Sequence, residues 1–128
     1  MDTEQLNILS KRIIGAAIEV HRTLGPGLLE HTYQEALLTE LRLRGIRAEK
    51  EVPLPCVYKG LKLDCGFRAD ILVEDSIILE LKATETEIPL HLKQLTTYLR
   101  VADKRLGLLI NFNREILCEG IKRAVNKF

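Results

Sequence analysis

Two short apolar runs that contain charged residues constrain this chain more than any other feature. Residues 69–73 and 77–81 are rich in β-branched residues and leucine, and the polar residues 74–76 join them. This pattern predicts a β-hairpin with a short turn. Asp70 then lies on its first strand and Glu80 on its second.

Side-chain alternation gathers the charges of this hairpin together. Glu80 and Lys82 share one face of their strand, whereas Leu79 and Leu81 occupy the other. An ionised group among apolar residues is costly unless it is paired or bound to a metal. Two alternatives stay open at this point. The face is either an ordinary solvent-facing side of an antiparallel sheet, or a site in which two carboxylates and an ammonium act together.

The rest of the chain alternates between helical and strand periodicity in the order ααββββαββ. Gly25-Pro26-Gly27 separates the first two helices, and Pro53 and Pro55, which lack an N–H, place the first strand at a sheet edge. The expected helices run from residue 2 or 3 to 24, from 28–30 to 44, and from 89 to 102. The expected strands cover residues 48–57, 61–65, 69–73, 77–81 and 106–112, with one or two short strands in 116–125.

Length and composition indicate one soluble globular domain over residues 1–128. A chain of 128 residues with 46% hydrophobic residues can bury a core without disulfides or a structural metal. The three cysteines, Cys56, Cys65 and Cys118, are an odd number without CxxC spacing. This argues against a disulfide framework, a zinc site or an iron–sulfur cluster, so a reducing cytoplasm is the simplest location.

Targeting and charge patterns narrow the choice of partners. We find no leader-like N-terminal segment and no apolar run of membrane-spanning length, so we expect no membrane partner. The net charge is only +1, but the segment 63–87 is acidic and the segments 40–62 and 88–128 are basic. This distribution suits a metal ion at the centre and a polyanion around it.

Motif spacing adds a second constraint. Asp70 is followed after nine residues by Glu80-x-Lys82 and then by a helix, and Gly27, Glu30 and Tyr33 form the pattern G-x-x-E-x-x-Y. With these motifs the chain resembles the GxxExxY family of the PD-(D/E)xK nuclease superfamily. Further matching segments are residues 66–70, 80–83, 106–112 and 120–123.

The helix after the hairpin carries another element of the resemblance. Gln94 and Tyr98 look like the Q-x-x-x-Y element of the exonuclease branch of the superfamily. Phe67 is a departure, because relatives often have tyrosine at this position. Without the resemblance, Gln94 and Tyr98 are equally well explained as helix-face residues packed on the sheet.

The resemblance implies both a fold and a chemistry. The fold is an α/β (α+β) domain of the restriction-endonuclease type, with a central mixed sheet of about four strands flanked by helices. The chemistry is Mg²⁺- or Mn²⁺-dependent hydrolysis of phosphodiester bonds in DNA or RNA. Asp70 and Glu80 would hold the ion with the carbonyl oxygen of Leu81, and Glu30 would complete the metal site. Lys82 would orient the attacking water and offset charge on the phosphate.

Other polar residues are candidates for phosphate binding. Gln94 and Tyr98 are placed to hydrogen-bond the scissile phosphate or to fix Lys82. Arg68 is either a phosphate contact or a salt-bridge partner, and His91 is either a phosphate contact or a solvated helix residue. Two rival functions stay open, namely a non-catalytic module that binds nucleic acid or protein, and a phosphohydrolase that acts on mononucleotides. Oligomeric state is open as well, with a homodimer among the alternatives.

Overall fold

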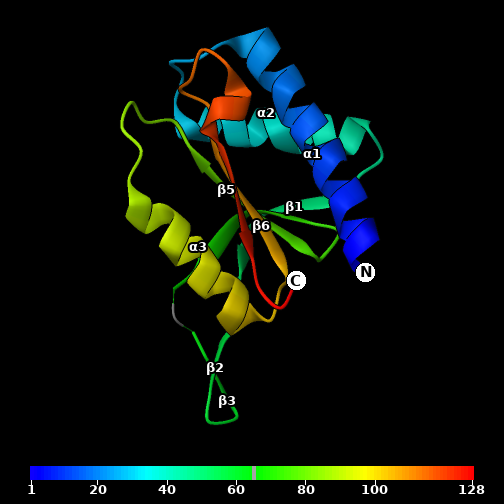
Figure 1. Cartoon of the computed structure of the whole chain (residues 1–128), viewed down its shortest axis with the longest axis vertical. Coiled ribbons are helices and arrows are strands. Elements are labelled where there is room, and N and C mark those ends of the chain that lie inside the picture. Colours follow the sequence, from blue (N-terminus) through cyan, green and yellow to red (C-terminus); the bar gives the residue numbers. More distant parts are fainter. Residues whose placement is uncertain (65) are drawn as a thin grey trace.

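The computed structural model describes residues 1–64 and 66–128 and shows an α/β fold with one main sheet between helices (Figure 1). The helices are α1 (Thr3–Leu24), α2 (Glu30–Leu43) and α3 (Pro89–Ala102), with a short 3-10 helix η1 (Leu117–Gly120). The strands are β1 (Ala48–Pro53), β2 (Cys56–Tyr58), β3 (Leu61–Leu63), β4 (Arg68–Val73), β5 (Ile77–Lys82), β6 (Leu106–Asn111) and β7 (Ile121–Val125). The predicted fold class is confirmed, and the main sheet has five strands rather than about four.

The central hairpin lies in the interior of the sheet. The strand order is β1-β4-β5-β6-β7, so β4 and β5 each have a neighbour on both sides. β5 and β6 are parallel and every other pair of neighbours is antiparallel. A parallel pair needs a crossover connection, which α3 supplies. The predicted hairpin with its turn at residues 74–76 is confirmed.

Helices cover both faces of the sheet, α1 and α2 on one side and α3 on the other (Figure 1). Leu79 and Leu81 of β5 pack into the core cluster that contains α1 and α2. Ile78 packs instead into the cluster that contains Leu95 and Leu99 of α3. Because side chains alternate, the even-numbered residues of β5 face α3. Glu80 and Lys82 therefore emerge on the α3 side.

Local sequence signals set the ends of the helices. The Asp2 side chain accepts a hydrogen bond from the Gln5 N–H (2.8 Å) and the Gln5 side chain accepts one from the Asp2 N–H (2.9 Å), which forms a capping box at the start of α1. Gly25 (φ 73°) and Gly27 (φ 97°) shape the turn into α2, with backbone angles that other residues rarely adopt. Pro89 occupies the first turn of α3, as expected.

The strand expected over residues 48–57 is wrong, because the structure has two separate strands there. Pro53 and Pro55 cannot donate to a ladder, so β1 ends at Pro53 on the edge of the main sheet. β2 pairs with β3 in a second, two-stranded sheet that projects from the body (Figure 1). The strand expected at 61–65 is confirmed for Leu61–Leu63, and Cys65 lies outside the described residues.

The segment 116–125 is also only partly the strand that was expected. Its first half is η1, in which Leu117 is buried against the cluster that contains α1 and α2. A Cβ atom on Gly120 would lie 2.3 Å from the Asn111 carbonyl oxygen, so the chain passes β6 too closely for a side chain at this position. Only Ile121–Val125 joins the sheet, as β7. No helix in the described ranges is long and apolar enough to span a membrane.

Candidate active site

The site begins where the two strands of the central hairpin separate. The last residues paired between β4 and β5 toward this end are Ile71 and Leu79. Beyond them the Leu81 N–H donates to Oδ2 of Asp70 at 2.8 Å, so a side chain replaces the backbone ladder. The Asp70 carboxylate is thereby fixed against β5.

Glu80 has the most perturbed environment in this site. Its Oε1 atom is buried and has no hydrogen-bond partner among the described residues. Burial, and next the Asp70 carboxylate, raise the pKa of Glu80 to about 8, against the opposing effect of the Lys82 ammonium. Burial is also the main cause that raises the pKa of Asp70, while the Leu81 N–H and Lys82 lower it. Two carboxyl groups are thus held together in a setting that disfavours two negative charges.

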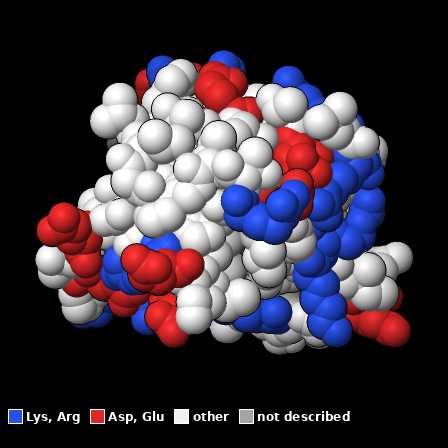
Figure 2. Space-filling view, turned by 90° about the horizontal axis from the view of Figure 1, so that it is seen from above, with Lys and Arg blue, Asp and Glu red and all other residues white. Residues whose placement is uncertain are grey.

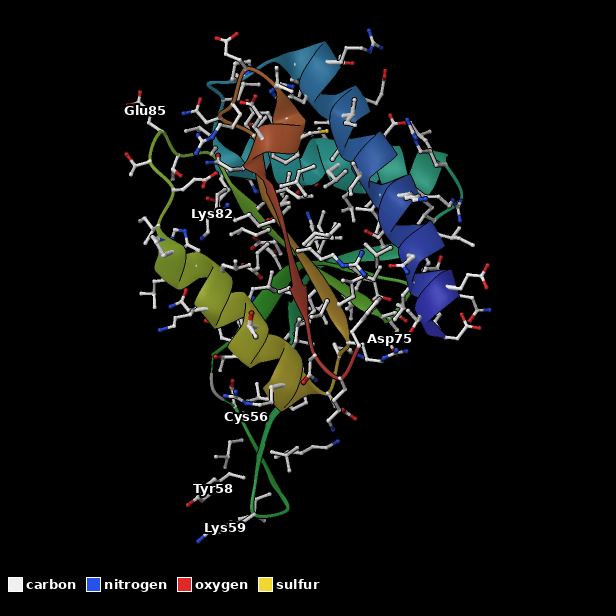
Figure 3. The ribbon with its side chains drawn as sticks, in the orientation of Figure 1. Cys56, Tyr58, Lys59, Asp75, Lys82 and Glu85 are labelled. Atoms are coloured by element: carbon white, nitrogen blue, oxygen red, sulfur yellow. The ribbon has the colours of Figure 1, made fainter. Side chains whose placement is uncertain are left out.

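Lys82 and Glu30 complete the cluster from two different elements. Figure 3 shows Lys82 on the side of the sheet that α3 covers. Glu30, in the first turn of α2, stays partly open to solvent. Partial burial raises the pKa of Glu30, the Lys82 ammonium opposes this rise, and the Asp70 carboxylate adds to it. The structure therefore brings Glu30, Asp70, Glu80 and Lys82 to one place.

Tyr33 holds the turn that precedes Glu30. Its hydroxyl donates to the Gly25 carbonyl oxygen at 2.5 Å and accepts from the Leu28 N–H at 3.1 Å. The ring is fully buried and stacks on Phe112, with ring centroids 4.5 Å apart. The G-x-x-E-x-x-Y spacing thus has a physical basis, since the tyrosine ties the turn to the core and the turn places the glutamate.

A cavity of about 520 Å³ lies against Glu80 and Lys82 on the α3 side of the sheet. Arg68, Gln94 and Tyr98 all line this cavity. The Tyr98 ring stacks on Phe67, which also lines it. No hydrogen bond joins Gln94 or Tyr98 to Lys82 within residues 1–64 and 66–128, so their role toward Lys82 stays a prediction.

His91 lies on the other side of Lys82. It lines a second cavity together with Lys82 and is absent from the lining of the first. Burial, and then the nearby Lys82 ammonium, lower the pKa of His91 below its ordinary value. His91 is partly exposed beside Lys82, so its two alternatives, a phosphate contact or a solvated helix residue, stay predictions.

Comparison with known proteins agrees with this arrangement. The sequence profile of the PD-(D/E)XK nuclease superfamily matches residues 7–124, which is nearly the whole chain. The chain belongs to the PD-(D/E)XK nuclease superfamily. No curated protein and no solved structure shows a significant match.

Nucleases of this superfamily typically use divalent metal ions. Within the described ranges, no three His, Cys, Asp or Glu side chains converge closely enough to hold a metal by themselves. The Asp70 and Glu80 carboxylates lie near each other, and the Leu81 N–H is bonded to Asp70. Since the Lys82 carbonyl accepts from Phe112 N–H on the β6 side, the Leu81 carbonyl points to the β4 side, toward Asp70.

The chemistry of these donors fits a divalent cation. Mg²⁺ prefers a few carboxylate and carbonyl oxygens and keeps several waters, so it does not require a third carboxylate. A bound cation would supply the missing partner of Glu80 Oε1 and would favour the ionised form of both carboxylates. The role of Glu30 as a further ligand stays a prediction.

Two features of this PD-(D/E)XK site were missed in the sequence. Glu51, on the edge strand β1, lies opposite Asp70 between the residue pairs Lys50–Ile71 and Val52–Ala69. It contributes to the raised pKa of Asp70 and has a positive φ of 52°. The second feature is the cavity beside His91. Neither has a local signal, because both depend on which strands become neighbours.

Surface charge is unevenly distributed in this superfamily member. Seen from above, Lys and Arg side chains gather along one side of the surface, beside a broad area without charge (Figure 2). The net charge of +1 gives no general attraction for a polyanion. Two cations, Arg68 and Lys82, line the cavity beside Glu80, and their role toward a phosphate stays a prediction.

Proposed function

We propose that the protein is a Mg²⁺- or Mn²⁺-dependent nuclease that hydrolyses phosphodiester bonds in DNA or RNA. The observation that carries this proposal is the buried Glu80 Oε1, which has no hydrogen-bond partner in the described chain and lies near Asp70 and Lys82. An unsatisfied buried polar group costs about 1–3 kcal/mol, so a purely structural carboxylate would be paired. A cation that binds oxygen satisfies it.

Each residue of the cluster has a role in this proposal. Asp70, Glu80 and the Leu81 carbonyl would hold the cation, which when bound would supply Lewis-acid chemistry at the phosphate and at a water. The Lys82 ammonium donates to the phosphate and offsets the negative charge that builds up on it during hydrolysis. Glu30, whose carboxylate lies near the Lys82 ammonium, would complete the metal site from α2.

The cavity beside Glu80 supplies the phosphate site. Arg68 can bind a phosphate through two parallel N–H donors, and Gln94 and Tyr98 add neutral donors from α3. The finer assignment to the GxxExxY family belongs to this proposal and is supported by the connected roles of Gly27, Glu30 and Tyr33. A cytoplasmic location is also proposed, and the free cysteines Cys56 and Cys118 are consistent with it.

The test is cleavage of labelled DNA and RNA by the purified protein. Single strands and duplexes are incubated with Mg²⁺, Mn²⁺ or EDTA, and mononucleotides are included as a separate substrate. Asp70→Asn and Glu80→Gln remove one site carboxylate each. Asp75→Asn is the matched control, because it makes the same chemical change in the exposed turn of the same hairpin, at a positive φ that asparagine tolerates.

We expect metal-dependent cleavage that Asp70→Asn and Glu80→Gln abolish and Asp75→Asn retains. Turnover of mononucleotides alone would replace the proposal by a phosphohydrolase. Stoichiometric nucleic-acid binding without any turnover would leave a binding module on the same fold. Cleavage that persists in both site variants would show a contaminating nuclease.

A further inference from the structure

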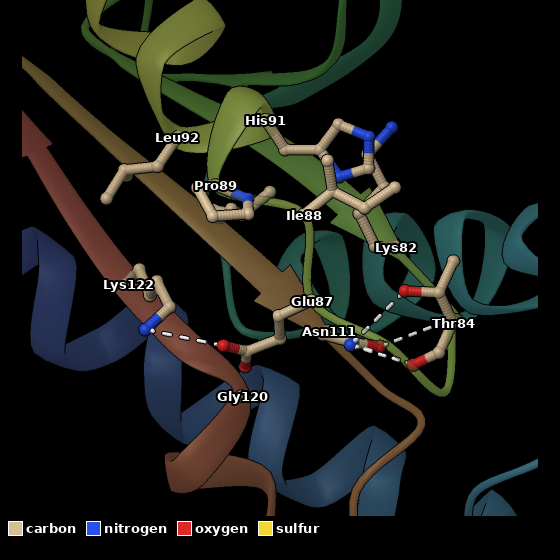
Figure 4. A pocket seen from close by; sticks show the side chains of 11 residues that line it. Lys82, Thr84, Glu87, Ile88, Pro89, His91, Leu92, Asn111, Gly120 and Lys122 are labelled. Carbon is tan, nitrogen blue, oxygen red and sulfur yellow. Dashed lines mark hydrogen bonds and ion pairs between the residues drawn. The ribbon is translucent and has the colours of Figure 1, made fainter.

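A second cavity lies beside Lys82, on the opposite side from the phosphate site described above. Its volume is about 270 Å³, and it is bounded by the segment that leads into α3, by the start of α3, and by β6 and β7 (Figure 4). Lys82 lines both cavities. A phosphate bound to the Lys82 ammonium would therefore lie next to both cavities.

Internal bonds keep the walls of this cavity in place. The buried Asn111 side chain donates to the Thr84 carbonyl oxygen at 3.0 Å and accepts from the Thr84 N–H at 3.2 Å, which ties the loop after β5 to the end of β6. Glu87 pairs with Arg114 (3.2 Å) and Lys122 (3.5 Å). The cavity is thus preformed rather than a gap between mobile segments.

The lining is apolar on one wall and polar at its margins. Ile88, Leu92 and Leu109 provide aliphatic contact area, and His91 adds a flat imidazole next to Lys82. Lys122 and Glu87 lie toward the other end of the cavity (Figure 4). This combination suits a small, flat group with apolar faces and polar edges, attached to an anion.

We propose that this cavity binds one unpaired nucleobase next to the phosphate held by Lys82. The proposal rests on the nuclease function above, because it takes Lys82 as the phosphate-binding group. A volume of about 270 Å³ lies below the range typical for drug-sized ligands, so it suits one base rather than a longer stretch of strand. A base that is paired and stacked in a duplex is not free to enter a pocket of this kind, whereas an unpaired base is. The preferred substrate is therefore a single strand or a frayed end of DNA or RNA.

Binding without turnover tests this inference separately from nuclease activity. In EDTA, fluorescence anisotropy measures the affinity for a labelled oligothymidylate, for an abasic deoxyribose-phosphate oligomer of the same length and charge, and for a blunt duplex. An oligouridylate distinguishes RNA from DNA. We expect the oligothymidylate to bind roughly tenfold more tightly than the abasic oligomer or the duplex, because only it can place an unpaired base in the cavity.

Leu92→Trp fills the cavity, and Leu90→Trp is its matched control. Leu90 lies on the same helix, is 55% exposed and lines neither this cavity nor the phosphate site. Ile88→Trp is a second filling variant, since Ile88 is 48% exposed and its replacement is compatible with folding. Both filling variants should bind the oligothymidylate and the abasic oligomer equally, whereas Leu90→Trp should retain the preference.

The outcomes distinguish the nucleobase site from the nuclease function. A base preference that both filling variants lose supports the nucleobase site, even if no substrate is cleaved and the nuclease proposal fails. Cleavage by a protein that binds the abasic oligomer as tightly as the oligothymidylate keeps the nuclease and overturns the nucleobase site. The site is also overturned if the wild type binds neither oligomer, or if both filling variants keep the preference.

Discussion

The titration of Glu80 offers the sharpest physical test of the site in the metal-free protein. Burial and the Asp70 carboxylate raise the pKa of Glu80 from 4.5 to about 8. In the unfolded chain this carboxyl group titrates near its ordinary value. Between these two values the folded protein holds a proton that the unfolded chain has released, so the free energy of unfolding falls as pH rises.

The size of this effect follows from the two pKa values. Each unit of difference corresponds to about 1.4 kcal/mol, so the contribution of Glu80 is on the order of 5 kcal/mol. It is fully present below pH 4.5 and is lost as pH rises to about 8. Such a loss is a large fraction of the free energy of unfolding of a typical domain, which is roughly 5–15 kcal/mol.

The assay is urea unfolding followed by circular dichroism, in EDTA, from acidic to mildly alkaline pH. Glu80→Gln keeps the shape of the side chain and cannot titrate, so the difference between wild type and this variant isolates Glu80 from all other groups. Glu85→Gln makes the same change at an exposed position and should follow the wild type. Parallel pH curves for wild type and Glu80→Gln would refute the argument that this carboxyl group is held in an apolar, negatively charged setting.

Three further predictions concern the same cluster. In EDTA at pH 8, Asp70→Asn should melt at or above the wild-type temperature, because it relieves the repulsion between the site carboxylates. Mg²⁺ at ten times its dissociation constant should raise the wild-type Tm by roughly 3–6 °C. Calorimetric scans that show a destabilised variant and no response to metal would make Asp70 a structural residue. Lys82→Ala should retain Mn²⁺ binding in titration calorimetry while turnover falls sharply, and loss of Mn²⁺ binding would contradict the division of roles. Tyr33→Phe should lower the free energy of unfolding by about 1–3 kcal/mol in urea titrations, because the partly buried partners of its hydroxyl lose their hydrogen bonds. An unchanged unfolding midpoint would show that the turn before Glu30 does not depend on this hydroxyl.

Much of the fold could be predicted because its signals are local. The hairpin around Asp70 is encoded by alternation and a polar turn, and the helices carry their own start and stop residues. The error at 48–57 arose because strand propensity continues past Pro55 although the backbone cannot remain in the ladder. The error at 116–125 arose because Ile116 and Leu117 have a strand-like pattern, whereas the close approach of Gly120 to β6 is a tertiary contact.

In the candidate site, too, the residues that could be predicted are those with a local sequence signal. Asp70, Glu80 and Lys82 could be grouped from sequence because one hairpin carries them. The position of Glu51 opposite Asp70 depends on β1 pairing with β4, which no local pattern specifies. The cavity beside His91 likewise depends on Asn111, which joins two segments 27 residues apart in the chain.

The projecting hairpin of β2 and β3 has a consequence for how the molecule can be divided. Its exposed tip, at Tyr58 and Lys59 (Figure 3), separates the half of the chain that carries Glu30 from the half that carries Asp70, Glu80 and Lys82. Exposed tips of this kind tolerate nicks and insertions. A chain cleaved there would remain joined through the β1–β4 ladder, so two polypeptides could reconstitute one site by fragment complementation. The same tip is a place where evolution can add a module for target selection without disturbing the central hairpin.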